Sequence, residues 1–143
     1  MKMYTDLEQS KKLAEILPLE SADMFIADVF LKEEQTHSYN FHVLTTWGHK
    51  NFDELKEREN KFVQFIPCWS LAALIELMPS EIKGHDLAMY KSYCYNDKGF
   101  AYSVYYEGEF IDYEQSILFS TFSMEFIDAC YEMIIKLHEQ KLL

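Results

Sequence analysis

Hydrophobic residues dominate the short segment from Trp69 to Met78, where only Ser70 and Glu76 are polar. A helix that is apolar around most of its circumference must be buried on several sides. Ser70 is placed to cap the first turn, and Pro79 cannot continue the helix. The pattern therefore predicts a short, buried helix at the centre of the fold.

Two longer helical patterns lie towards the ends of the sequence. Thr5 and Glu8 have the spacing of a capping box, and the helix that they open is expected to stop before Pro18. Ser123 is the expected N-cap of a long helix whose apolar residues recur every three or four positions. Three helices are therefore predicted, at the start, the middle and the end of the chain.

Runs with the composition of β-strands separate these helices. Five of them have a suitable length, and they span residues 24–31, 39–45, 61–66, 88–95 and 100–106. The last two are joined by Asn96-Asp97-Lys98-Gly99, which suits a hairpin turn with Gly99 in the left-handed position. Residues 47–51 and Glu107-Gly108-Glu109 are expected to form further turns, and another short strand is expected within 110–119.

The order of these elements indicates an α+β fold. We expect a small antiparallel sheet of three to five strands, with the three main helices packed largely on one face. The chain of 143 residues has the length of one domain, and four glycines with three prolines leave little room for a long linker. The expected organisation is a single α+β domain over residues 1–143.

The chain is strongly acidic, with a formal net charge of −11 at pH 7. No window clusters the lysines and arginines that phosphate binding requires, so the charge disfavours nucleic acid and anionic membranes as partners. No apolar run approaches the ~20 residues of a membrane-spanning helix. The first residues do not have the pattern of a signal peptide, and the expected location is therefore cytoplasmic.

The acidic residues are unevenly distributed along the chain. No Lys or Arg occurs between Lys98 and Lys136. Seven acidic residues fall in this interval, namely Glu107, Glu109, Asp112, Glu114, Glu125, Asp128 and Glu132. The simpler interpretation is a solvated surface, and the functional one is a negative patch that steers a basic partner.

Tyrosines are concentrated in the predicted hairpin. Seven fall within 24 residues, at positions 90, 93, 95, 102, 105, 106 and 113. The β-propensity of tyrosine explains this without any function, whereas an aromatic surface would dock a protein. Stacking of nucleic-acid bases is a third interpretation, which the nearby carboxylates oppose. The candidate interaction surface combines both features in Tyr102, Tyr105, Glu107, Glu109, Asp112 and Glu114.

Signals for catalysis or metal binding are weak. Cys68 precedes a helix N-terminus, which lowers the pKa of a thiol, but a Cys nucleophile also needs a base, and the nearest histidine in sequence is His85. A buried structural cysteine is the favoured interpretation. Cys68, Cys94 and Cys130 are odd in number and far apart in the sequence, which argues against a disulfide framework. The five histidines, at 37, 42, 49, 85 and 138, form no HxH or HExxH motif. No catalytic residue, metal site or cofactor is assigned.

Three blocks carry a resemblance to other proteins. They are Leu7–Leu17, Pro67–Leu74 and Asp128–Glu139, which lie in the three predicted helices. Together they resemble a family of short uncharacterised proteins from gut bacteria and their phages or mobile elements. The resemblance implies one compact α+β domain and carries no activity, cofactor or catalytic residue.

Three functions are consistent with these patterns. The leading hypothesis is a non-enzymatic acidic protein that binds a basic protein partner, as an accessory or inhibitor protein of a mobile element would. A DNA mimic is the first alternative, and it would need rows of carboxylates at phosphate-like spacing. A small enzyme with Cys68 as its nucleophile is the second, and it would need an accessible thiol beside a histidine.

Overall fold

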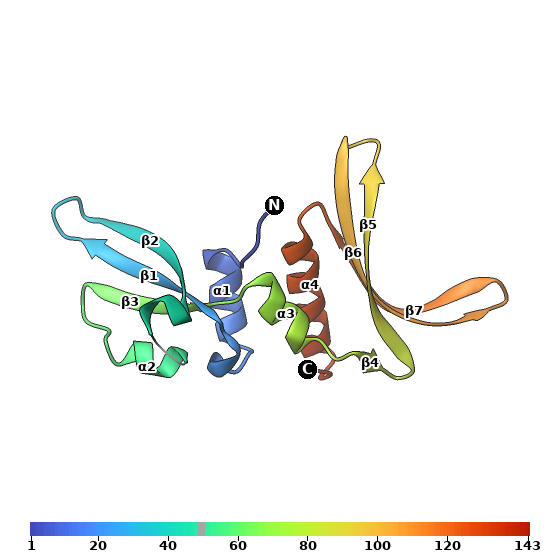
Figure 1. Ribbon diagram of the computed structural model, residues 1–143, viewed down its shortest axis with the longest axis horizontal. Helices are drawn as coiled ribbons and strands as arrows, with labels where there is room; N and C mark the ends of the chain where they lie inside the picture. The colour runs from blue at the N-terminus through green and yellow to red at the C-terminus, as the bar shows by residue number, and fades with distance from the viewer. Residues whose placement is uncertain (49–50) are drawn as a thin grey trace. The chain divides into compact units, whose positions relative to one another are not determined.

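A computed structural model describes residues 1–48 and 51–143 of the chain (Figure 1). The α+β class is confirmed, and all the strands pair in an antiparallel manner. The strands lie in two sheets, of three and four strands, rather than in the single sheet that was expected. The chain divides into two compact units, residues 4–73 and residues 1–3 with 74–143. The single domain over residues 1–143 stays a prediction, and part of the turn expected at 47–51 lies outside the described residues.

The unit of residues 4–73 is built on a sheet with the strand order β2-β1-β3. Its elements are α1 (Leu7–Ala14), η1 (Leu19–Ser21), β1 (Met24–Leu31), β2 (Thr36–Val43), η2 (Leu44–Trp47), α2 (Phe52–Lys56) and β3 (Val63–Cys68). The boundary between the units falls within α3 (Leu71–Leu77). Strand β1 has the bounds that its apolar run predicts, whereas β2 begins three residues before the predicted strand.

Strand β1 pairs with both neighbours and is buried on both faces, which explains why all its residues except Asp28 are apolar. One face contributes to a cluster of Phe25, Ala27, Leu44, Phe52, Leu55 and Phe65. The other contributes Met24 and Ile26, which pack with Cys68 and with Leu7 of α1. Helices α1 and α2 therefore cover opposite faces of this sheet, because a central strand that is apolar on both sides needs a cover on each.

Helix α1 begins one residue later than its predicted capping box. Asp6 is the N-cap, and its side chain and that of Gln9 make the reciprocal bonds of a capping box. Thr5 is not available for this role, because its hydroxyl is fully buried and accepts a hydrogen bond from the backbone N–H of Trp69 at 3.1 Å. The bond is to a residue 64 positions away, which local spacing does not reveal.

The predicted cap of the central helix is confirmed, and the helix is buried on several sides, as its apolar pattern predicts. Ser70 Oγ accepts from the backbone N–H of Ala73 at 3.2 Å and donates to Asp23, which also accepts from the N–H of Ser70. Leu74 is fully buried. Glu76 is exposed, so the helix keeps one side in water.

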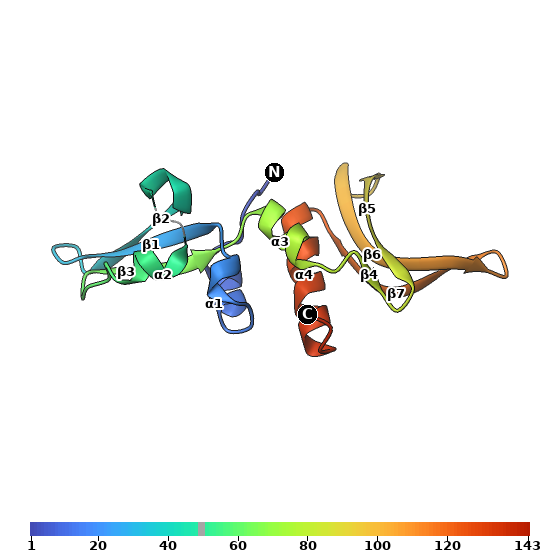
Figure 2. The ribbon, with the colours of Figure 1, turned by 60° about the horizontal axis from the view of Figure 1, so that its bottom comes forward.

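The unit of residues 1–3 and 74–143 contains the sheet β4-β5-β6-β7 and one long helix (Figure 1). The elements are β4 (Glu81–Ile82), β5 (His85–Cys94), β6 (Gly99–Ile111), β7 (Glu114–Ser123) and α4 (Phe126–Glu139). Figure 2 shows α4 beside the strands, and Thr121 of β7 donates a buried hydrogen bond of 2.7 Å to the carbonyl of Ala129 in α4. Val104 and Tyr106 of β6 are fully buried.

Three local predictions in this unit are wrong. The left-handed residue of the β5–β6 turn is Lys98 instead of Gly99, which pairs with Cys94. Residues 107–109 form no turn but lie within β6, at a shift in its register with β7. Ser123 does not cap α4, because Glu125 is the N-cap residue and its own N–H donates to Ser123 Oγ at 3.2 Å.

In the part of the chain that the structure describes, no helix has the length and apolar character needed to cross a membrane.

Candidate functional site

The register of β5, β6 and β7 assigns the candidate residues to two faces of the sheet. Side chains alternate between the faces, and residues directly paired across strands share one. Thr121 contacts α4 and pairs with Val104. Val104 and the alternate residues of β6 on the same side, including Tyr102, therefore form the face that α4 covers. The opposite face, which we call the open face, holds Asp86, Ala88, Tyr90, Ser103, Tyr105 and Glu107.

Tyr102 and Tyr105 therefore do not belong to one surface. Tyr102 stacks on Phe126 of α4 with the ring centroids 5.2 Å apart, and its hydroxyl lies 3.5 Å from the sulfur of Met1. Tyr105 lies on the open face, where its ring centroid is 5.7 Å from that of Tyr90. Of the two tyrosines in the predicted surface, only Tyr105 shares a face with a candidate carboxylate.

Tyr90 links the aromatic and acidic parts of the open face. Its hydroxyl donates a hydrogen bond to Glu107 Oε1 at 2.5 Å. This bond to a carboxylate raises the pKa of Tyr90 above its usual value, because ionisation of the phenol would place two negative charges together. The ring itself stays 49% exposed. It is thus held in one orientation while remaining accessible to a ligand.

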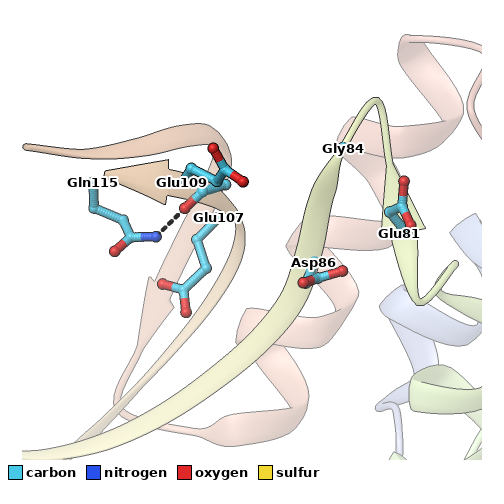
Figure 3. A pocket seen from close by; sticks show the side chains of 7 residues that line it. Glu81, Gly84, Asp86, Glu107, Glu109 and Gln115 are labelled. Atoms are coloured by element: carbon cyan, nitrogen blue, oxygen red, sulfur yellow. Dashed lines mark hydrogen bonds between the residues drawn. The ribbon is translucent and has the colours of Figure 1, made fainter. Parts of the chain in front are cut away.

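Beside this face, four carboxylates surround a hollow of about 380 Å³. Figure 3 shows Glu81 and Asp86 on the β4–β5 hairpin and Glu107 and Glu109 on the other side of the hollow. Gly84, Gly108 and Gln115 complete the lining, in which the described residues include no lysine or arginine. The hollow is therefore a concentrated region of negative charge that suits a cationic group.

Two local features hold the walls of the hollow in place. Lys83 and Gly84 both have positive φ angles, as a two-residue hairpin turn between β4 and β5 requires. The second feature is the close approach of Gly108 to His85, because a Cβ atom on Gly108 would lie only 3.0 Å from the His85 ring. The His85 ring lies 3.0 Å from the carbonyl of Lys83 through Nδ1 and 2.9 Å from Ser116 Oγ through Nε2. His85 thus connects the β4–β5 turn to β7.

Beyond the hollow, β6 and β7 continue as a two-stranded arm. Strand β5 pairs with β6 only as far as Glu107, whereas β6 and β7 remain paired up to Ile111 and Glu114 (Figure 1). Phe110 and Ile111 are 71% and 65% exposed, and the whole of Tyr113 faces water at the turn. The candidate residues Asp112 and Glu114 lie at this tip. The arm presents apolar side chains between carboxylates.

Two acidic residues of the base-free interval are already paired within the chain. The Lys2 ammonium lies 2.8 Å from Asp128 Oδ1, and the Lys2 backbone N–H donates to Glu125 Oε2 at 2.9 Å. Of the other five, Glu132 is exposed on α4, and Glu107, Glu109, Asp112 and Glu114 lie at the hollow and the arm. Sequence reasoning missed Glu81 and Asp86, and it named Tyr90 only as a member of the tyrosine cluster. Extending the predicted strand back to His85 would have paired Asp86 with Glu107 and so revealed one of them.

Cys68 lacks the accessibility that the catalytic hypothesis requires. Its side chain is fully buried, and its thiol donates towards the carbonyl of Thr5 at 3.4 Å. Desolvation by burial raises the pKa of Cys68, and hydrogen bonds from Thr5 and Ser10 only partly oppose it. The thiol is therefore a packed, protonated group in the core between α1 and β3.

No group of three or more His, Cys, Asp or Glu side chains among the described residues has the arrangement of a metal site, and His49 lies outside that part of the chain. Comparisons with protein families, curated proteins and solved structures find no match to this chain. The resemblance of its helical blocks to short proteins of gut bacteria and phages stays a hypothesis.

Proposed function

We propose that the chain is a non-enzymatic binding protein that holds a basic protein partner on the sheet β4-β5-β6-β7. The observation that carries this proposal is the hollow lined by Glu81, Asp86, Glu107 and Glu109. These carboxylates come from three strands, and two of them, Glu107 and Glu109, lie in the interval between Lys98 and Lys136 that has no Lys or Arg. Such a concentration of charge raises the local concentration of a basic partner and speeds its association.

The arm adds an apolar contact to this electrostatic attraction. Phe110, Ile111 and Tyr113 are exposed between Glu109, Asp112 and Glu114. Aromatic anchors supply most of the binding energy in many protein interfaces, whereas exposed charges mainly set the association rate and the choice of partner. The proposed division of labour is that the carboxylates attract the partner and the aromatic residues hold it. A role as an accessory or inhibitor protein of a mobile element, acting in the cytoplasm, fits this proposal.

The test is the capture of partners from a cell extract by the immobilised protein and by a variant with Glu107, Glu109, Asp112 and Glu114 changed to lysine. A matched control changes four exposed acidic residues of the other unit, Glu33, Glu34, Asp53 and Glu57, and alters the net charge equally. The proposal predicts that basic proteins are lost only from the first variant and that capture weakens as salt rises. Unchanged capture by the first variant would contradict it.

Competition separates this proposal from the DNA-mimic alternative. A DNA mimic occupies the nucleic-acid site of its partner, so duplex DNA would displace the captured protein. A partner that is held through a different basic surface stays bound when duplex DNA is added. The same competition, repeated with the purified partner, distinguishes the DNA-mimic hypothesis from the proposed function.

A further inference from the structure

The sheet already contains one cation bound to aromatic rings, on the face that α4 covers. The Lys91 ammonium lies 4.3 Å from the ring centroid of Phe100 and 5.8 Å from that of Tyr102. On the open face, Tyr90 and Tyr105 form a comparable pair of rings. None of the cation–π contacts found within residues 1–48 and 51–143 involves this second pair.

The surroundings of Tyr90 and Tyr105 leave their rings accessible and place negative charge next to them. The direct cross-strand neighbours are Ser103 for Tyr90 and Ala88 and Ser120 for Tyr105, all of which are too small to cover the rings. Glu107 accepts a hydrogen bond from the Tyr90 hydroxyl through one oxygen, and a carboxylate can accept further hydrogen bonds through both of its oxygens. Asp86 is exposed and pairs directly with Glu107.

We propose that the open face receives an arginine side chain of the basic partner, with its guanidinium on the rings of Tyr90 and Tyr105 and its N–H groups directed to Glu107 and Asp86. This inference rests on the proposed function and names the group that is recognised. Arginine fits better than lysine, because a planar guanidinium can stack on a ring and form a bidentate bond to a carboxylate at the same time. The occupant is an exposed, arginine-bearing segment of a protein. A nucleic acid is not proposed, because the carboxylates of this face would repel its phosphates.

The test measures the affinity of the whole chain for a fluorescein-labelled peptide of alternating glycine and arginine, by fluorescence anisotropy at low salt. The same peptide with citrulline in place of arginine keeps the shape and removes the charge. Tyr90→Leu removes one ring, and Tyr90→Phe keeps the ring while losing the bond to Glu107. Tyr93→Leu is the matched control, because Tyr93 lies on the same strand with its side chain on the other face and is 48% exposed.

The proposal predicts that the arginine peptide binds and that the citrulline peptide does not. Tyr90→Leu weakens binding about two- to fivefold, and adding Tyr105→Leu brings the loss to roughly tenfold. Glu107→Gln also weakens binding, whereas Tyr90→Phe and Tyr93→Leu stay close to the unaltered protein. Circular dichroism confirms that each variant is folded.

Three results would overturn the proposal, and they separate it from the proposed function. Binding that survives the double Tyr90→Leu, Tyr105→Leu change but is lost on reversing Glu109, Asp112 and Glu114 would refute the arginine site and leave the acidic binding function. An absence of binding to the arginine peptide, while the immobilised protein still captures basic proteins, would refute the arginine site and leave the proposed function. Tighter binding of single-stranded oligothymidylate than of the arginine peptide would show that the rings stack on bases instead.

Discussion

The contact between Gly108 and His85 gives the sharpest prediction about how the acidic hollow is built. The φ angle of Gly108 is not in the left-handed region, so alanine fits the backbone there. Without a steric conflict, such a change stabilises a protein by about 0.4–1 kcal/mol, because it restricts the unfolded chain. The new Cβ, however, would lie 3.0 Å from Cδ2 and 3.1 Å from Nε2 of the His85 ring.

The ring cannot move away without a cost. Its two nitrogens lie within hydrogen-bonding distance of the Lys83 carbonyl and Ser116 Oγ. A shift of the ring weakens at least one of these bonds, each worth about 1 kcal/mol, and crowding typically adds about 1–3 kcal/mol. We therefore expect Gly108→Ala to destabilise this unit by about 1–2 kcal/mol. In a His85→Ala background the conflict is absent, and the same change should stabilise the unit by about 0.5 kcal/mol.

The assay is a double-mutant cycle measured by urea unfolding, followed through the amide resonances of β5 and β6 so that the signal belongs to this sheet. The predicted coupling free energy between positions 85 and 108 is about 2 kcal/mol. Gly108→Ala should destabilise the protein when His85 is present and stabilise it when His85 is replaced by alanine. An equal effect of Gly108→Ala with and without His85 would refute the contact. It would also refute the inference that this contact helps to hold the walls of the hollow in place.

Three further predictions concern the core. Thr5→Val removes the acceptor of the buried Trp69 N–H and should lower the free energy of unfolding by about 1–3 kcal/mol, whereas Thr5→Ser keeps the acceptor; urea titration followed by tryptophan fluorescence compares them. The Cys68 thiol should react with a labelling reagent only when urea unfolds the protein, and rapid labelling of the native state would contradict its burial. Desolvation raises the pKa of Tyr106 to about 12 from 10.0, so its neutral form is favoured in the fold. Its contribution to stability should be complete below pH 10.0 and should be lost as the pH rises towards about 12. Burial raises the pKa of Cys130 to about 12 as well, so Cys130 also contributes to the loss of stability at high pH. Tyr106→Phe should therefore reduce this loss of stability without removing it. Urea titrations of both proteins between pH 10.0 and about 12 measure the difference in their free energies of unfolding.

Local sequence patterns predicted the parts of the fold that depend on neighbouring residues. The run from Met24 to Leu31 is apolar at nearly every position, and it is the central strand of its sheet. Ser70 caps the central helix because the side chain and the N–H of Ala73 are three residues apart. Contacts between distant residues explain the failures. Thr5 is engaged by Trp69, and the division of the strands between two sheets depends on pairing that no local pattern encodes.

The candidate surface was predicted only in part, because some of its residues come together through contacts between distant parts of the chain. Glu107 and Glu109 were identified from the base-free interval, and the structure places both at the hollow. Glu81 and Asp86 were missed because β4 has two residues and its turn begins with Lys83, which rarely adopts a positive φ angle. Tyr90 reaches this surface through its register with Ser103, and a register cannot be read from a strand's composition.

Chemical-shift mapping tests the central claim most directly. The arginine–glycine peptide is titrated into the ¹⁵N-labelled chain, and the amide resonances that move are assigned. Binding to the acidic surface predicts that the largest changes occur in residues 81–90 and 105–115, on both sides of the hollow. Changes confined to residues 4–73, or no change at low salt, would contradict the claim.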